Sequence, residues 1–293
     1  MKKAFGGFLF IIVLFTLSCV KDMDEAYIPS YISIDAIEVS TTGEQGSSSS
    51  YITDAWVYIN GKEMGAYQLP STIPLLAEGM NTIKIAPGIK LNGVSETRVP
   101  YPMVKPVEME VDLIKDSVKS LSVNCQYFST SKFALIEDFE SINFAFEPTQ
   151  FNTAEWRVSD RDTDPENYVF EGNHSGLGVL DEDHNKLQLL TKQMFEELPK
   201  KGTPVFIELN FKCSTTVVLS IMAYKHGVGE STDVINLNPT DEWKKIYVNL
   251  TSTLSYDVNH DEYKFLITAN HNHYNEESIV LIDNFKIIYR EIE

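Results

Sequence analysis

The chain of 293 residues carries 24 basic and 42 acidic side chains, which gives a formal net charge of −18. That charge repels phosphate backbones and anionic lipid head groups, so it argues against nucleic-acid binding and against electrostatic adsorption to membranes. Hydrophobic residues make up 43% of the chain, enough for packed cores. The length predicts two domains, because single cores rarely exceed roughly 150–200 residues.

The N-terminus has the anatomy of a bacterial export signal. Two lysines precede an apolar run over residues 8–17, which is too short for a transmembrane helix because a bilayer requires roughly 20 apolar residues. The run leads into the sequence TLSC at 16–19, which resembles a lipobox, although Thr16 stands where that motif prefers leucine. The resemblance implies cleavage after residue 18 and attachment of diacylglycerol to Cys19. The alternative is an ordinary secreted protein with an incidental cysteine at this position.

Lipidation at Cys19 predicts a protein held at the outer membrane by its lipid anchor alone, because two or more acyl chains give stable attachment. The polar residues 20–25 resemble the Lys- and Asp-rich tags that send some lipoproteins to the cell exterior. We therefore expect the cell surface, with the periplasmic face as the alternative. Residues 1–18 are assigned to the signal peptide, and residues 19–30 to the lipidated cysteine and a tether.

From residue 31 onward, short β-rich runs alternate with turns rich in glycine, proline and asparagine. The predicted strands are, in chain order, 31–41, 55–59, 80–86, 95–99, 107–113, 121–127, 133–139, 155–159, 205–211, 217–224, 245–250, 263–269 and 279–289. Asn60-Gly61 is a strong hairpin signal, and the stretch 191–198 is the one predicted helix. Strands spaced about ten residues apart favour sandwiches over alternating strands and helices. We predict an all-β protein with one sandwich over 31–130 and a second over 131–293.

The first half contains short sequences that resemble a known domain type. They are VYING at 57–61, IPLL at 73–76, the Glu-Gly pair at 78–79 and TIKI at 82–85. Together they resemble PEGA and carboxypeptidase-regulatory-like domains, which are small immunoglobulin-like sandwiches of exported bacterial proteins. The resemblance implies a non-catalytic spacer or interaction module.

The second half contains four landmarks in a fixed order. They are IEDFE at 136–140, HSG at 174–176, WKKIYV at 243–248 and LIDNFKI at 281–287. Their order resembles that of galactose-binding-like modules, a jelly-roll fold that includes many non-catalytic carbohydrate-binding modules. The resemblance implies a jelly roll whose ligand is a poly- or oligosaccharide.

Asp283 is the most informative single residue. The two-residue period of a strand places it on the same face as Phe285, so its carboxylate points toward apolar side chains. Such a buried carboxylate needs a cation, an arginine or several N–H donors. In the modules that this half resembles, an acid on the first strand and an aspartate on the last often bind a structural calcium ion. The resemblance thus implies calcium bound by Glu140 and Asp283. The loop at Asn173 and Ser175 would supply further oxygens. The alternative is that Asp283 lies at the strand's rim and bonds a turn.

Two other patterns are weaker metal candidates. The acidic stretch 160–171 has the spacing of a twelve-residue calcium loop, but Pro165 stands where the sharp turn requires glycine. His271 and His273 lie in an asparagine-rich turn and provide only two of the three or four ligands that zinc sites use. We expect a solvated loop and a turn at these places.

Aromatic side chains are candidates for stacking on sugar rings, because the C–H face of a sugar suits an aromatic platform. We predict Trp156, Tyr256 and Tyr274 as ligand-binding residues, with ordinary packing as the alternative for each. Trp243, which opens a strand, is predicted to anchor the core. Cys125 and Cys213 each share a strand face with apolar residues of a different sheet, so we expect both to be buried thiols without a disulfide.

Catalytic patterns are missing from the sequence. There is no Gly-Xaa-Ser-Xaa-Gly elbow and no phosphate-cradling glycine loop, and Glu137 with Asp138 has no special spacing. We therefore expect no enzymatic activity. The predicted function is non-catalytic glycan binding by a lipid-anchored exported protein. The alternative is a structural or assembly lipoprotein that binds an envelope protein, and a glycoside hydrolase or its accessory protein is the third hypothesis.

Overall fold

The computed structural model describes residues 28–291. The predicted signal peptide and Cys19 lie outside the described residues, as does the tether up to residue 27. None of the helices in the described part has the length and apolar content to cross a membrane.

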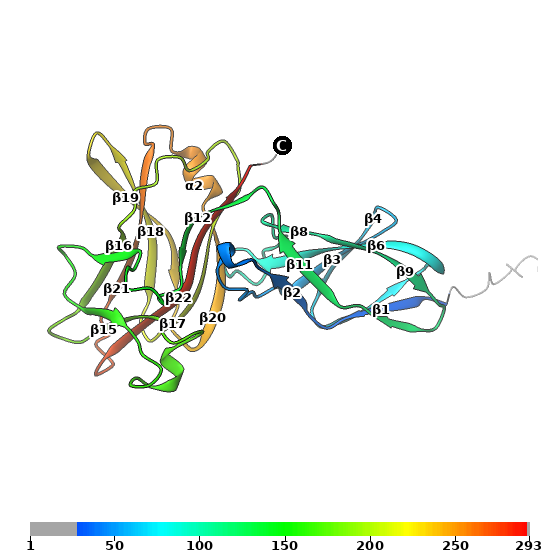
Figure 1. Ribbon diagram of the computed structural model, residues 1–293, viewed down its shortest axis with the longest axis horizontal. Coiled ribbons are helices and arrows are strands. Elements are labelled where there is room, and N and C mark those ends of the chain that lie inside the picture. Colours follow the sequence, from blue (N-terminus) through cyan, green and yellow to red (C-terminus); the bar gives the residue numbers. More distant parts are fainter. Residues whose placement is uncertain (1–27, 292–293) are drawn as a thin grey trace, which may run out of the picture.

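The first half of the described chain folds into a sandwich of short strands (Figure 1). Its strands are β1 (Ser30–Ile34), β2 (Ile37–Ser40), β3 (Asp54–Ile59), β4 (Lys62–Gln68), β5 (Ser71–Leu75), β6 (Gly79–Lys90), β7 (Arg98–Pro100), β8 (Val104–Lys105), β9 (Val107–Leu113), β10 (Val118–Ser120) and β11 (Val123–Tyr127). Two three-stranded sheets, β10-β1-β5 and β2-β11-β8, form one layer. The sheet β4-β3-β6-β7, with β9 also paired to β6, forms the other.

Local sequence explains this sandwich. In β1 every second residue is buried, so Ile32 and Ile34 face the core while the residues between them face outward. Asn60 and Gly61 both have positive φ, 50° and 79°, and join β3 to β4. A two-residue turn of that kind matches the twist of the flanking strands, so the predicted hairpin is confirmed.

The second half folds into a larger sandwich. Its elements are β12 (Ser131–Glu137), β13 (Phe146–Pro148), β14 (Glu155–Val158), β15 (Gly176–Leu180), β16 (Lys186–Thr191), β17 (Val205–Cys213), β18 (Val217–Lys225), β19 (Val228–Leu237), β20 (Thr240–Asn249), α2 (Thr251–Tyr256), β21 (Glu262–Asn270) and β22 (Ser278–Arg290). One sheet has the order β14-β15-β22-β17-β20, with β12 beside β22. The other has the order β13-β16-β21-β18-β19. The all-β sandwich prediction is confirmed.

The core of this second sandwich lies between the inner faces of its two sheets. Leu209 and Phe285 come from the first sheet, and Phe265 and Ile221 come from the second; all four are buried in one apolar cluster. Cys213 lies in the same cluster, and Cys125 lies in the core of the first sandwich. Both thiols are free, as predicted.

The predicted helix over 191–198 is wrong. Phe195 instead forms an isolated antiparallel bridge with Tyr263, and their backbone groups exchange two hydrogen bonds of 2.9 Å. Eight residues are too few for a helix that is stable by itself, so packing decides the conformation. Here, burial of Phe195 and Leu198 fixes an irregular segment across the sandwich edge.

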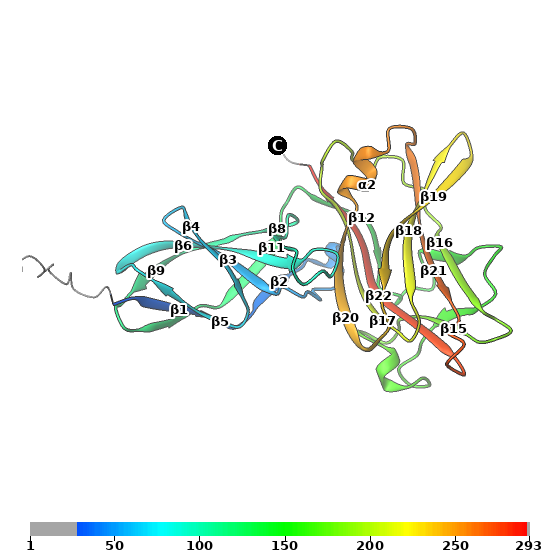
Figure 2. The same cartoon turned by 180° about the vertical axis from the view of Figure 1, so that it is seen from behind.

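The two sandwiches lie end to end, with one end of the first packed on the outer face of the sheet that contains β22, β17 and β20 (Figures 1 and 2). Phe206, Tyr247 and Ile288 of that sheet belong to the apolar cluster of the first sandwich. The ring of Tyr101 lies 5.5 Å from that of Phe206 and 4.8 Å from that of Tyr247. Because the junction continues a hydrophobic core, it holds the two sandwiches in a fixed orientation.

Candidate functional site

A cleft of about 550 Å³ opens beside this junction, between the loop that follows β6 and the edge strands β19 and β20. Small-molecule sites typically have volumes of roughly 300–1,000 Å³, so the cleft is large enough for a few sugar units. The side chains that give it its chemistry are Tyr51, Lys90, Ser95, Asn236, Asn238, Glu242, Trp243 and Lys244.

The loop after β6 is fixed against β20 by hydrogen bonds. The Asn92 N–H donates to the carbonyl of Tyr247 at 3.0 Å, and the Asn92 side-chain oxygen accepts from the N–H of Asn249 at 2.8 Å. Gly93 follows with a φ of 70°, and a Cβ there would lie 3.2 Å from Ile246. The glycine therefore allows the loop to lie close to β20, and this contact forms one wall of the cleft.

Four aromatic residues line the cleft, and of these Tyr51 comes from the first sandwich and Trp243 from the margin of the second. The Nε1–H of Trp243 donates to the carbonyl of Asn167 at 3.0 Å, and its ring lies 5.4 Å from that of Phe170. These contacts hold the indole in one orientation. Tyr51 is 52% exposed, with the Nζ of Lys90 6.0 Å from its ring centre. The predicted core position of Trp243 is wrong, because the residue lies at the start of an edge strand whose outer face meets the cleft.

The three predicted ligand residues lie on different elements. Trp156 is half-buried on β14 and packs edge-to-face on Phe139, with 6.0 Å between the ring centres, at the margin of the core. Tyr256 ends α2, is largely exposed and lines a separate pocket of about 490 Å³. Tyr274 is exposed in the turn between β21 and β22. The structure therefore gives Trp156 a packing role and does not place Tyr256 or Tyr274 at the junction cleft.

Asp283 is buried as predicted, and hydrogen-bond donors surround it. One carboxylate oxygen accepts from the Ser175 hydroxyl at 2.7 Å and from the Glu171 N–H at 3.4 Å. The other oxygen accepts from the N–H of Asn284 at 2.7 Å. Burial nevertheless raises the pKa of Asp283 from 3.8 to about 7, because the loss of hydration outweighs these three hydrogen bonds.

Glu140 is exposed and binds the same loop from outside. One of its oxygens accepts from the backbone N–H groups of Asn173 and His174, at 2.7 and 2.9 Å. Gly172 has a φ of 64°, and a Cβ there would lie 2.2 Å from that oxygen, so the close approach requires glycine. Glu140 and Asp283 thus clasp the loop 171–175 between them. Calcium requires oxygen ligands, whereas N–H and O–H groups point at these carboxylates, so the donor set does not fit the ion.

Chelation gives a direct check of this interpretation. We expect an excess of EDTA to leave the thermal unfolding midpoint unchanged, because hydrogen bonds within the chain already satisfy both carboxylates. Differential scanning calorimetry with added calcium, with EDTA and with neither makes the comparison. A midpoint several degrees higher in calcium would contradict the clasp and restore the predicted metal site.

The other acidic and histidine candidates have structural partners. The buried Glu137 accepts from the N–H groups of Phe139 and Ala145, and burial raises its pKa. The Nδ1 of His271 lies 3.1 Å from the Ser278 hydroxyl, and its ring is 5.4 Å from that of His273. Within residues 28–291, no group of three or more His, Cys, Asp or Glu side chains is arranged to hold a metal ion.

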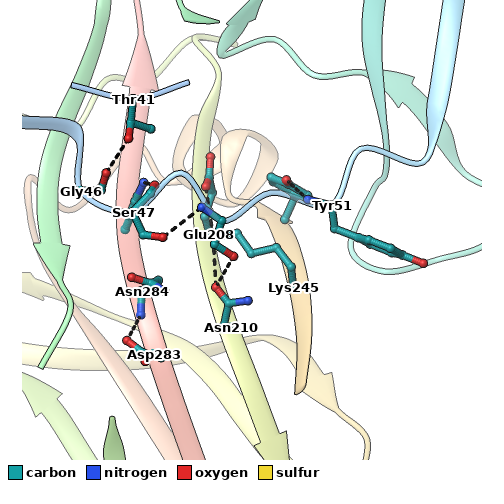
Figure 3. A network of polar contacts seen from close by, with 12 residues as sticks. Thr41, Gly46, Ser47, Tyr51, Glu208, Asn210, Lys245, Asp283 and Asn284 are labelled. Carbon is teal, nitrogen blue, oxygen red and sulfur yellow. Dashed lines mark hydrogen bonds and ion pairs between the residues drawn. The ribbon is translucent and has the colours of Figure 1, made fainter. Parts of the chain in front are cut away.

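A buried polar network lies beside the cleft, at the junction itself (Figure 3). Glu208 is fully buried on β17 and accepts hydrogen bonds from the hydroxyls of Tyr101, at 2.5 Å, and Tyr127, at 2.9 Å. The Nζ of Lys245, which also lines the cleft, lies 3.4 Å from Glu208. Burial lowers the pKa of Lys245 although Glu208 opposes that shift, and it raises the pKa values of both tyrosines.

Further hydrogen bonds attach the loop before β3 to the second sandwich. The hydroxyl of Ser49 donates to the Asn210 side chain at 3.0 Å, and the Tyr51 N–H donates to the Tyr247 hydroxyl at 2.8 Å (Figure 3). Lys286 donates from its Nζ to the carbonyl of Ser47 at 2.5 Å. Tyr51, the aromatic residue that the first sandwich contributes to the cleft, is thus held in place by the same network that joins the domains.

No protein family matches this sequence, and no curated protein matches it. Several solved structures do match the chain. The enzymatically active domain of bacteriophage CBA120 tailspike protein 4 matches 58% of this chain at 12% identity, with a TM-score of 0.40. The CBM22-1–GH10 modules of Clostridium thermocellum xylanase 10B, complexed with xylohexaose, match 55% at 10% identity, with a TM-score of 0.38. These matches cover only 26% and 29% of the two proteins.

Isolated carbohydrate-binding modules match over most of their own length. TmCBM61, in complex with β-1,4-galactotriose, is covered to 91% by 48% of this chain, at 16% identity and a TM-score of 0.28. A CBM29-2 variant is covered to 91% by 55% of this chain, at 11% identity and a TM-score of 0.31. Both matches are at low sequence identity.

Proposed function

We propose that the protein is an exported, lipid-anchored and non-catalytic protein that binds a glycan in the junction cleft. The observation that carries this proposal is that Tyr51 and Trp243, one from each sandwich, line the cleft beside amide, hydroxyl and charged side chains. An aromatic face suits the C–H face of a sugar ring, while amides and hydroxyls hydrogen-bond its hydroxyl groups.

The lining of the cleft favours binding over hydrolysis. Glycoside hydrolases use a pair of carboxylates, roughly 5–9.5 Å apart, across the scissile bond. Glu242 is the one carboxylate among the residues that line the cleft. A single acid supplies no general acid and nucleophile together, so we propose that the ligand is held and released unchanged.

The charge of the cleft points to an anionic glycan. The chain as a whole has many more acidic than basic side chains, yet Lys90, Lys244 and Lys245 line the cleft against Glu242 alone. Lys245 is committed to Glu208, which leaves Lys90 and Lys244 for a ligand. Ammonium groups attract carboxylate and sulfate groups, so a polysaccharide that contains uronate or sulfate is the preferred class.

Replacing the aromatic side chains tests the binding site. We expect Trp243→Ala and Tyr51→Ala each to weaken glycan binding by about tenfold or more, equivalent to roughly 1.4 kcal/mol, because each removes a stacking face. Affinity electrophoresis against neutral, uronate-containing and sulfated polysaccharides would select the ligand, and isothermal titration calorimetry would measure its affinity.

Tyr274→Ala is the matched control, because this exposed tyrosine lies in a turn outside the cleft. It should bind as the unmodified protein does, and Trp243→Phe should recover part of the affinity. The proposal fails if every polysaccharide is negative, or if both cleft variants bind normally. Capture of one dominant envelope protein with no sugar retention would favour the assembly hypothesis instead.

A further inference from the structure

The end of the first sandwich that lies opposite the second holds the start of β1 (Figures 1 and 2). Several apolar side chains in and next to the strand ends that pair around this start of β1 are exposed. Each is more than half exposed, and we call the set the apolar tip: Ile28 54%, Leu76 71%, Met80 65%, Ile114 62% and Val118 58%. Single exposed apolar residues are ordinary, but several together mark a surface that contacts something else.

Strand pairing places the segments that carry the apolar tip side by side. Leu75, just before Leu76, pairs with Ser30, and Val118 pairs with the next residue of β1, Tyr31. Met80 pairs with Asp112 at the far end of the sheet formed by β6 and β9. Two further contacts join the loop that follows β9 to its neighbours. The Asp116 N–H donates to the Pro29 carbonyl at 2.9 Å, and Lys115 forms an ion pair with Glu78 at 2.9 Å.

The place where the described chain begins indicates what covers this surface. Ile28 is the first described residue and belongs to the apolar tip. Cys19, the proposed lipidation site, stands nine residues before it. Nine residues span at most about 30 Å when fully extended, so a lipid on Cys19 would keep the apolar tip within that distance of the bilayer.

The charges around the apolar tip are almost balanced. The charged residues next to the apolar tip in the chain are Glu78, Asp112, Asp116, Lys115 and Lys119, and the ion pair between Lys115 and Glu78 neutralises one charge of each sign. Electrostatic attraction to anionic lipids is therefore weak here. Contact with a bilayer would depend on apolar insertion, as it does for interfacial segments with low net charge.

We propose that the apolar tip rests on the bilayer to which the N-terminus is anchored, an inference that depends on the lipid anchoring proposed above. The five side chains enter the interfacial region beside the anchor. The first sandwich then stands away from the membrane, and the second sandwich with its cleft lies at the far end. The first domain thus acts as a spacer that presents the cleft to glycans outside the membrane.

Site-directed fluorescence tests this orientation on the full-length, lipidated chain reconstituted in phosphatidylcholine vesicles. An environment-sensitive dye is attached to Leu76→Cys or Met80→Cys, and brominated lipids serve as the quencher. The native Cys125 and Cys213 are buried and react slowly. Val258→Cys is the matched control, because it is also a largely exposed apolar position but lies in the second sandwich.

We expect a blue-shifted emission and several-fold stronger quenching at positions 76 and 80 than at position 258. Equal, water-like spectra at all three positions would overturn the proposal, as would photocrosslinking from position 76 to another protein instead of lipid. Cys19→Ser distinguishes a failure of the lipid anchoring from a failure of the orientation. If this variant and the unmodified protein remain equally in the membrane fraction, the anchoring itself is wrong. If anchoring holds but position 76 stays in water, only the orientation is wrong.

Discussion

Glu208→Ala is expected to lower the free energy of unfolding by about 3–5 kcal/mol, which is the usual cost of leaving a buried charge without its partner. The substitution leaves the ammonium of Lys245 without its ion-pair partner, and this ammonium lies 3.4 Å from Glu208 on a side chain that is almost fully buried. It also removes the acceptor of the Tyr101 and Tyr127 hydroxyls. Urea unfolding followed by tryptophan fluorescence and by circular dichroism measures the loss.

Two further variants separate charge from packing. Glu208→Gln keeps an acceptor for the tyrosine hydroxyls but loses the ion pair, so we expect an intermediate loss. Glu242→Ala removes an exposed glutamate from the adjacent strand and should change stability by less than about 0.5 kcal/mol. If Glu208→Ala lost no more than this control, the junction network would not hold the domains together.

The fold could be predicted from the sequence because it depends on local patterns. Alternation in β1 and the Asn60-Gly61 turn each specify strand geometry through a few neighbouring residues. The helix predicted over 191–198 and the undetected β19 show the limit. β19 is an edge strand that is mostly polar and exposed, so it carries no hydrophobic period and is defined only by its pairing with β18.

The candidate site could be predicted only in part. Tyr51, the loop at Asn92 and the strand that bears Trp243 are distant in sequence and meet only through the packing of one sandwich on the other. The sequence does carry one signal of the junction network: Glu208 and Lys286 each lie within a largely apolar strand, as Asp283 does. A charged residue within such a strand indicates a buried polar network, or an outer sheet face that another domain covers. Here the first sandwich covers that face, and Glu208 belongs to a buried network in the junction.

Asp283 should make stability depend on pH in an unusual direction. Its pKa in the folded protein is about 7, whereas the ordinary value is 3.8, so between these values the folded state holds a proton that the unfolded state has released. Stability from this group is therefore present at low pH and is lost as pH rises from about 4 to 7, by about 4 kcal/mol in all. Lys286 acts in the opposite sense at higher pH, because burial lowers its pKa from 10.5 to about 8. Between these values the folded state has released a proton that the unfolded state still holds, so the free energy of unfolding rises with pH.

Asp283→Asn isolates the first effect, because the amide cannot ionise yet offers one oxygen to the Ser175 hydroxyl. Relative to the unmodified protein, we expect this variant to gain stability as pH rises from about 4 to 7 and then to level off, and urea unfolding between pH 4 and 8 measures the gain. Asp138→Asn replaces an exposed carboxyl of the same domain and should show no such trend. A pH-independent difference between Asp283→Asn and the unmodified protein would mean that the carboxylate is already ionised in the fold. The three donors around it would then outweigh its burial, and the clasp on the loop 171–175 would be held by charge rather than by a neutral acid.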